Sequence, residues 1–175
     1  MTDMIAFLRA INVGGRMFPA ADIRRIAEGL DYADVATHIN TGNLFLRTEE
    51  PPASVAAALE CAFEADRGFA VPVMLFTADE YRAVVSAVAE LDDAALHRHY
   101  VYLRSEPLDA DTARRVENLS DERSRMVVRG RSIHALLGEG YKPGEVDPLR
   151  AAKLLEPATN RNANTIRAIA EKWLR

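Results

Sequence analysis

The sequence predicts an α+β protein made of two ferredoxin-like halves of the βαββαβ type, with antiparallel sheets, followed by short C-terminal helices. The first observation behind this fold class is the first half, where apolar residues form strand-length runs or recur at helical spacing in the order strand, helix, strand, strand, helix, strand. The second is that the rest of the chain repeats strand, helix, strand, strand. We predict a first half over 1–77, a connecting helix over 78–96, and a second half with the C-terminal helices over 97–175.

The elements of the first half follow from apolar runs and from the residues that begin or end them. The predicted strands are the apolar runs at 4–11, 35–39, 44–46 and 71–76. Pro19 suits the first turn of a helix whose apolar residues continue at helical spacing to Leu30. A second helix carries Val55 on its apolar face and ends at Gly68.

The second half is predicted by the same two patterns. Its strands are the apolar runs at 100–103, 126–128 and 133–137. The connecting helix presents Tyr81 and Val88 on one face, and a further helix carries Val116. Two short helices, at 149–155 and 166–174, form the tail.

Composition and charge restrict the class of partner. The chain has 175 residues and a formal net charge of −4, which argues against a broad surface for a phosphate backbone, so nucleic acid is the less favoured partner. The chain has no apolar run long enough to span a membrane and no basic segment followed by a signal core, so we expect a cytoplasmic protein. Its single cysteine, Cys61, lies among alanines, where a buried thiol is expected, and excludes an internal disulfide.

Three short polar clusters are the candidate ligand-binding residues. Each combines asparagine or glycine, which allow unusual backbone conformations and close approach to a ligand, and two of them add arginine. The candidates are Arg9, Asn12, Gly14, Gly15 and Arg16 in the first cluster, Thr41, Gly42 and Asn43 in the second, and Arg161, Asn162 and Asn164 in the third. Successive glycine N–H groups beside arginine, and the N-terminus of a helix, are both typical of anion sites.

Each cluster also has a purely structural interpretation. The two glycines can simply form a turn that needs a positive φ, and Gly42-Asn43 favours a tight hairpin. Asn162 or Asn164 can cap the last helix, where replacing asparagine by alanine typically costs about 1 kcal/mol. Spacing alone does not decide between the interpretations, and convergence of the clusters in one concave pocket would favour a ligand site.

Catalytic residues cannot be nominated from the sequence. The four histidines have no metal-ligand spacing, and no serine lies in a Gly-x-Ser-x-Gly turn. His97 and His99 are predicted to be a half-exposed pair on a strand. The sequence therefore predicts no metal site and identifies neither a cofactor nor a reaction, and it leaves the oligomeric state open.

The three clusters also carry a resemblance to a known family. The stretches Leu-Arg-Ala-Ile-Asn-Val-Gly-Gly-Arg at 8–16, Thr-Gly-Asn at 41–43 and Pro-Ala-Thr-Asn-Arg-Asn-Ala-Asn-Thr at 157–165 are similar to the domain of unknown function 1697 family. The resemblance covers essentially the whole chain in order. It implies two ferredoxin-like halves and no established activity.

Two classes of function remain. The first is a site for a small anionic or nucleotide-like ligand, with or without enzymatic activity, formed by the Gly/Asn/Arg loops. The second is a non-catalytic interaction module that binds RNA or a protein through a sheet face. The strand that begins at Asn43 lacks the aromatic residues of an RNA-binding sheet, which places RNA second.

Overall fold

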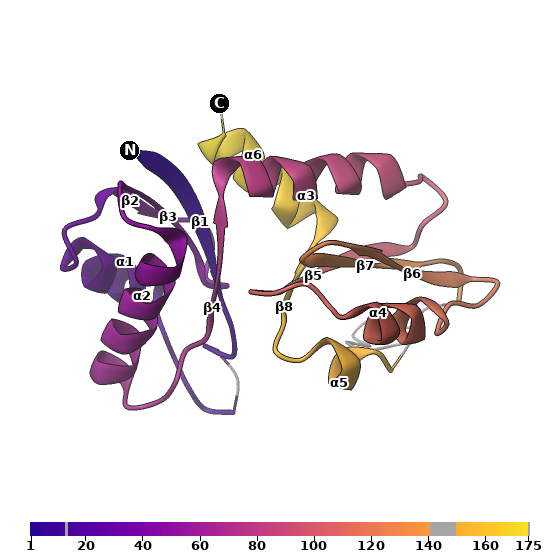
Figure 1. The fold of residues 1–175 in the computed structure, drawn as a ribbon, viewed down its shortest axis with the longest axis horizontal. Coiled ribbons are helices and arrows are strands. Elements are labelled where there is room, and N and C mark those ends of the chain that lie inside the picture. The colour runs from indigo at the N-terminus through magenta and orange to yellow at the C-terminus, as the bar shows by residue number, and fades with distance from the viewer. Residues whose placement is uncertain (13, 141–149, 175) are drawn as a thin grey trace. The chain divides into compact units, whose positions relative to one another are not determined.

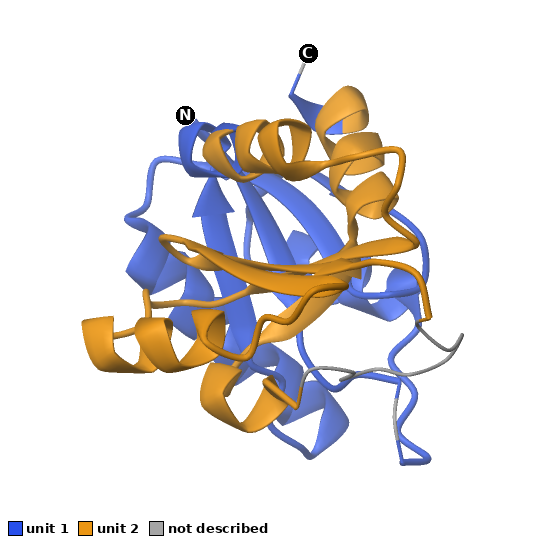
Figure 2. Ribbon diagram, turned by 90° about the vertical axis from the view of Figure 1, so that its right-hand side faces the viewer, with its two compact units in different colours: residues 1–82, 173–175 blue, residues 83–172 orange. Residues whose placement is uncertain are grey.

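The chain folds into two compact units in a computed structural model that describes residues 1–12, 14–140 and 150–174. Unit 1 comprises residues 1–82 and 173–175, and unit 2 comprises residues 83–172 (Figure 2). Each unit contains one four-stranded antiparallel sheet with helices packed on it. The predicted fold class is therefore confirmed: the protein is α+β with two similar halves and C-terminal helices.

Unit 1 has the predicted order of elements. They are β1 (Thr2–Leu8), α1 (Ala20–Glu28), β2 (Ala33–Thr37), β3 (Asn43–Thr48), α2 (Pro52–Arg67) and β4 (Val73–Thr77), and the strand order in the sheet is β2-β3-β1-β4. Gly68 ends α2 in the left-handed conformation with φ 73°, as predicted for a helix C-cap. Strand β1 is shorter than predicted because Ala10, with φ 57°, departs from extended backbone.

The core of unit 1 lies between the sheet and the two helices α1 and α2, which cover the same face (Figure 1). Alternate residues of β1, such as Met4 and Ala6, face this core with Ile23 of α1 and Leu59 of α2. The intervening residues of β1 face the other side, where the ring of Phe7 contacts Phe76 and Tyr81 at centroid distances of 6.0 and 5.5 Å.

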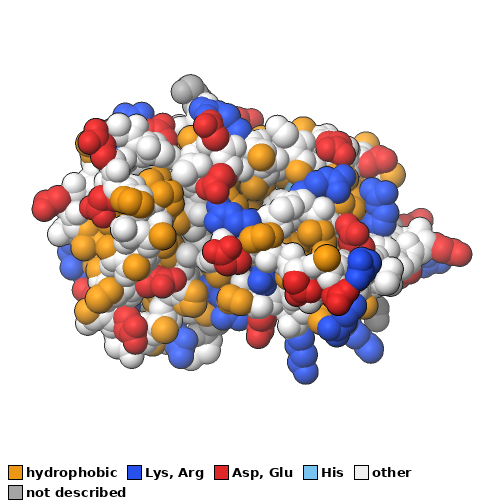
Figure 3. Space-filling view, in the orientation of Figure 1, with side chains coloured by type: hydrophobic (Ala, Val, Ile, Leu, Met, Phe, Trp, Pro, Cys, Tyr) orange, Lys and Arg blue, Asp and Glu red, His pale blue; other side chains and the backbone are white. Residues whose placement is uncertain are grey.

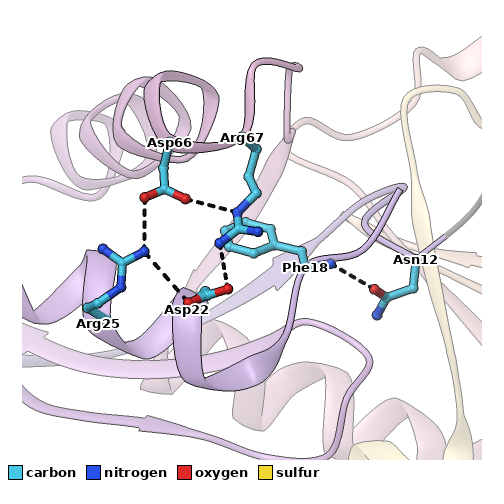
Figure 4. Close-up of polar contacts among 6 residues, drawn as sticks. All are labelled: Asn12, Phe18, Asp22, Arg25, Asp66 and Arg67. Carbon is cyan, nitrogen blue, oxygen red and sulfur yellow. Dashed lines mark hydrogen bonds and ion pairs between the residues drawn. The ribbon is translucent and has the colours of Figure 1, made fainter. Parts of the chain in front are cut away.

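Ion pairs on the outer side of this core join α1 to α2 and hold the loop that precedes α1 (Figure 4). Arg67 of α2 lies 2.5 Å from an oxygen of Asp22 and 2.9 Å from an oxygen of Asp66, and Arg25 of α1 donates to Asp66 at 2.9 Å. The Arg67 guanidinium also covers the ring of Phe18 at 4.7 Å. The start of α1 is thereby fixed to α2.

Helix α3 (Ala78–Leu91) begins in unit 1 and continues into unit 2. Unit 2 then contains β5 (Arg98–Leu103), α4 (Ala110–Glu117), β6 (Ser124–Arg129), β7 (Ser132–Leu137), α5 (Ala152–Leu155), β8 (Thr159–Asn162) and most of α6 (Ala163–Trp173). The strand order is β6-β7-β5-β8. The predicted helix at 149–155 matches α5, although residue 149 lies outside the described part of the chain.

Helices α4 and α5 cover one face of the second sheet. Ile133 and Ala135 of β7 face this side, in a core that includes Val116 of α4 and Leu155 of α5. Because side chains alternate along a strand, His134 points to the opposite face. The register places His134 opposite Val101 of β5, so this second face carries the histidines of both central strands.

Four local predictions need correction. Residues 159–162 form strand β8, because pairing with β5 satisfies their backbone groups, whereas the sequence predicted a loop. The β2–β3 connection spans residues 38–42 and is no two-residue hairpin. Cys61 is exposed on the outer side of α2. His99 is only 6% exposed while His97 is exposed, so the two do not form a half-exposed pair.

Candidate functional site

The glycine loop of the first cluster projects from unit 1. Gly14 and Gly15 have φ values of 60° and 80°, and a Cβ built on either residue would have no atom within 4 Å apart from those of the glycine and its chain neighbours. Asn12 anchors the loop, since its Nδ2 donates to the carbonyl oxygen of Asn40 at 2.8 Å. Its Oδ1 accepts from the N–H of Phe18 at 3.0 Å, the contact drawn in Figure 4. The side chain of Asn12 is thus used in holding two loops together.

The second cluster lies beside the first, as these bonds require. Gly42 accepts from the N–H of Leu8 at 2.8 Å, and a Cβ at Gly42 would lie 2.7 Å from Cδ1 of Ile11. Asn43 is 1% exposed, and its Nδ2 donates to the carbonyl oxygen of His38 at 3.0 Å and to Oγ1 of Thr41 at 2.9 Å. The two clusters therefore meet, and the contacts between and within them are structural.

The arginines of the first cluster differ in their surroundings. The Arg16 guanidinium lies over the ring of Phe69 at 4.7 Å. Arg9 donates its backbone N–H to the carbonyl oxygen of Pro72 at 3.0 Å, which continues the pairing of β1 with the residues before β4. Both contacts are within unit 1.

The third cluster belongs to unit 2 and divides into a structural and a pocket-lining part. Arg161 is 8% exposed and donates through Nη1 to Thr159 Oγ1 at 2.9 Å and to the carbonyl oxygen of Asn160 at 2.6 Å. Asn162 Oδ1 accepts from the N–H of Thr165 at 2.8 Å, which confirms the predicted helix cap at this residue. Asn164 instead accepts from Nη1 of Arg167 at 3.2 Å.

A pocket of about 380 Å³ opens between the start of α6 and the segment that leads into β5. Its lining contains two residues of the predicted set, Asn162 and Asn164, and further polar side chains that the sequence analysis did not select. The lining is Asp92, Leu96, His97, Arg98, His99, Tyr100, Asn162, Ala163, Asn164 and Arg167. All of these residues belong to unit 2.

The lining of this pocket contains one ion pair, Asp92 with Arg167, and one further cation, Arg98. Arg167 of α6 is paired with a carboxylate oxygen of Asp92, and Arg98 donates to the carbonyl oxygen of its neighbour His97 at 2.8 Å. Arg167 and His99 lower the pKa of the Asp92 carboxyl through hydrogen bonds that outweigh its partial burial. Asp92 is therefore ionised at neutral pH, and the two arginines leave an excess of positive charge.

A chain of hydrogen-bonded side chains runs from the pocket into the unit. Asp92 Oδ1 lies 3.3 Å from Nδ1 of His99, and Nε2 of His99 lies 2.9 Å from Nδ1 of His134. Nε2 of His134 lies 3.1 Å from Oγ of Ser132. The sequence analysis missed this chain, although a histidine inside the apolar run of β7 signals a buried polar group that needs a partner.

Burial governs the charge of both histidines. It lowers the pKa of His134 to about 3, with help from the positive charges of His99 and Arg129. Burial also lowers the pKa of His99, and this effect is opposed by the hydrogen bond and charge of Asp92. Both rings are neutral at neutral pH.

A second pocket of about 420 Å³ lies in the same unit and shares Asp92 and Leu96 with the first. Most of its ionisable lining is acidic, namely Glu90, Asp92, Asp93, Asp121 and Glu122, with Arg123 and Arg125 as the basic members. Several of these carboxylates have ordinary structural partners, such as Arg129 for Glu90 and the N–H of Ala95 for Asp93. Among the described residues, no group of three His, Cys, Asp or Glu side chains is arranged to hold a metal ion.

The architecture is that of a two-unit α+β protein with a polar pocket in unit 2, and comparison with known proteins agrees with this fold class. Residues 1–134 match the family model described as a protein of unknown function, DUF1697, and the chain belongs to this family. The structure of the conserved bacterial protein SP0830 from Streptococcus pneumoniae is similar over 100% of this chain and 99% of that chain, with a TM-score of 0.76 and 22% sequence identity. This similarity shows the fold. No protein of the curated set matches the sequence significantly.

Within residues 1–12, 14–140 and 150–174, no helix is both long enough and apolar enough to cross a bilayer.

Proposed function

We propose that the pocket at the start of α6 binds a small anionic ligand, of the size of a sugar phosphate or another small phosphorylated or carboxylated compound. The observation that supports this proposal most directly is the pocket lining, in which Arg98 and Arg167 outnumber the single carboxylate of Asp92. Arginine presents several N–H donors in a planar arrangement that suits phosphate and carboxylate groups.

The size and position of the pocket support the same class of ligand. Its volume of about 380 Å³ lies within the range of small-molecule sites, roughly 300–1,000 Å³. The pocket adjoins the first turn of α6, an eleven-residue helix whose N-terminal dipole favours negative charge. Asn164 adds a side-chain amide beside Arg167.

Thermal unfolding in the presence of sulfate, sugar phosphates, nucleoside monophosphates and dicarboxylates tests this proposal. An anion at 100 times its dissociation constant stabilises the protein by about 2.7 kcal/mol. We expect Arg98→Gln to abolish the stabilisation and Arg115→Gln, a change in an exposed arginine of α4 outside the pocket, to retain it. Stabilisation that survives Arg98→Gln would refute the assignment to this pocket.

A third variant separates the two predicted regions. The double substitution Arg9→Gln with Arg16→Gln removes the side-chain charges of the glycine loop in unit 1. If this variant alone lost the stabilisation, the anion would bind at the loop rather than at the pocket.

The alternative is an interaction module for RNA or a protein. On the face drawn in Figure 3, Lys and Arg side chains are interspersed with Asp and Glu, an arrangement that does not favour a phosphate backbone on that face. Stabilisation by a short RNA, with none by any small anion, would favour this alternative over the pocket.

A further inference from the structure

The buried chain of side chains in unit 2 uses every ring nitrogen of two histidines. It runs from Asp92 through His99 and His134 to Ser132, with contacts of 3.3, 2.9 and 3.1 Å. His134 is 0% exposed and Ser132 is 2% exposed, whereas Asp92 lines the pocket. The chain therefore connects a solvent-accessible carboxylate to the interior of the sheet.

Asp92 determines where His99 carries its first proton. A carboxylate only accepts hydrogen bonds, so an unprotonated Nδ1 of His99 facing Asp92 would place two acceptors together. Nδ1 of His99 is consequently protonated in both charge states of the ring. The remaining variable is the proton on its Nε2, at the contact with His134.

The direction of the other hydrogen bonds follows from whether Nε2 of His99 carries a proton. When His99 is neutral, its Nε2 accepts from Nδ1–H of His134, and Nε2 of His134 accepts from the hydroxyl of Ser132. When His99 is protonated, its Nε2–H donates to His134, Nε2–H of His134 donates to Ser132, and the Ser132 hydroxyl donates to the carbonyl oxygen of Arg129, which lies 3.0 Å away. One proton from solvent thus reverses two hydrogen bonds and turns the Ser132 hydroxyl to a new acceptor, and every ring N–H and the Ser132 hydroxyl keep an acceptor in both arrangements.

The charged groups that face His99 and His134 limit the two rings to one extra proton. Asp92, at the end of α3, and Arg167 of α6 face His99 with opposite charges, and Arg129 of β6 faces His134 while paired with Glu90 of α3 at 3.2 Å. A proton on His99 is next to a carboxylate, whereas a proton added to His134 would lie between His99 and the positive charge of Arg129. His99 is therefore the group that titrates first.

We propose that the hydrogen-bonded series from Asp92 to Ser132 is a one-proton relay, and that binding of an anion in the pocket is accompanied by uptake of one proton on His99. The second part rests on the proposed function. A negative charge beside Arg167 offsets the repulsion that this arginine exerts on a protonated His99. By linkage, the factor by which a bound anion favours protonation of His99 is also the factor by which protonation of His99 tightens anion binding. The affinity for the anion therefore rises by up to tenfold per pH unit across the interval in which His99 titrates.

Nitrogen-15 NMR of the imidazole rings in the wild-type protein tests the relay without a ligand. At about pH 7.5 we expect His99 and His134 both to carry their proton on Nδ1, which is the less common tautomer. As the pH is lowered and His99 becomes doubly protonated, His134 should stay neutral and transfer its proton to Nε2. A neutral Nε2–H tautomer of His99, or a His134 that keeps its tautomer while His99 titrates, would overturn the relay.

Calorimetric titration with sulfate, whose own charge does not change in this range, tests the coupling to binding. We expect the dissociation constant to fall three- to tenfold in the wild type between about pH 7.5 and the pH at which the NMR titration shows His99 doubly protonated, a dependence that is lost in His99→Gln. The matched control is His38→Gln, which replaces a histidine outside the pocket lining and should retain the dependence.

The outcomes separate the two proposals. Equal affinity for sulfate at both pH values would refute the coupling and leave the anion site standing. Absence of sulfate binding at either pH, with the tautomer change intact, would refute the anion site and its coupling and leave the relay standing. If His99→Gln does not fold, the wild-type NMR titration still decides the relay, and the wild-type pH dependence still decides the coupling.

Discussion

Replacing His134 by glutamine should remove a large part of the acid sensitivity of this protein. The pKa of His134 falls from 6.5 to about 3 in the folded state, chiefly through burial. The unfolded chain therefore takes up a proton at this residue below about pH 6.5, while the folded chain does not until about pH 3. Stability contributed by the neutral ring is fully present above the unfolded pKa and decreases as the pH falls.

The size of the effect follows from the interval between the two pKa values. Each pH unit below the unfolded pKa of 6.5 lowers the free energy of unfolding by about 1.4 kcal/mol. The free energy of unfolding of the wild type should therefore fall by about 2 kcal/mol between pH 7 and pH 5 on account of His134. Carboxylates whose pKa is lowered by their partners, such as Asp109, add acid sensitivity of their own. Their contribution is common to wild type and variant and cancels in the comparison.

Urea unfolding at pH 7, 6 and 5 measures this difference. We expect His134→Gln to be less stable than the wild type at pH 7, because a fitted ring is lost, and to lose about 2 kcal/mol less on acidification to pH 5. His97→Gln is the control, because His97 is exposed and lies just before strand β5 of the same sheet. Parallel loss of stability in wild type and His134→Gln would show that burial does not hold the His134 ring neutral in the folded protein.

Three further substitutions test structural roles of the polar clusters. Asn43→Ala removes two buried hydrogen bonds and should lower the free energy of unfolding by about 2 kcal/mol in urea, without changing stabilisation by anions. Gly42→Ala should cost about 2–4 kcal/mol, because its Cβ would lie 2.9 Å from Cβ of Leu8 at a φ of 72°, whereas Gly14→Ala, in open space, should cost about 1 kcal/mol by the same measurement. Arg67→Ala removes the contacts with Asp22 and with the ring of Phe18, and should lower the free energy of unfolding by about 1–2 kcal/mol, with a smaller loss in high salt. Similar losses for the two glycine variants, or none for Asn43→Ala, would contradict these assignments.

The order of secondary-structure elements could be predicted because it depends on local patterns. The apolar spacing of α2 and the glycine at its end specify a helix that stops at Gly68, whatever packs against it. Strand β8 could not be predicted in this way, since Thr-Asn-Arg-Asn has no apolar alternation and becomes a strand by pairing with β5. Propensity is overridden there by hydrogen bonds to a distant part of the chain.

The sequence marked special backbone in the polar clusters, whereas ligand binding by the candidate residues stays a prediction. Asparagine and glycine did mark special backbone, as the positive φ of Gly14 and Gly42 shows. Whether an asparagine side chain binds its own backbone or faces a pocket depends on neighbours from other strands, and Asn43 and Asn164 differ in this respect. Arg98 and Arg167 have no sequence signature as a pair, because they are brought together only by the position of α6 beside β5.

The sequence by itself determined the α+β class, the two similar halves and the family, because periodicity and short motifs are properties of neighbouring residues. The tertiary structure alone decided the contact of His99 with His134, which are 35 residues apart. That contact depends on the register of β5 against β7, which sets which side chains share a face, and a shift of one residue would send both rings to different environments. Chemistry that depends on such a register becomes visible only once the strands are paired.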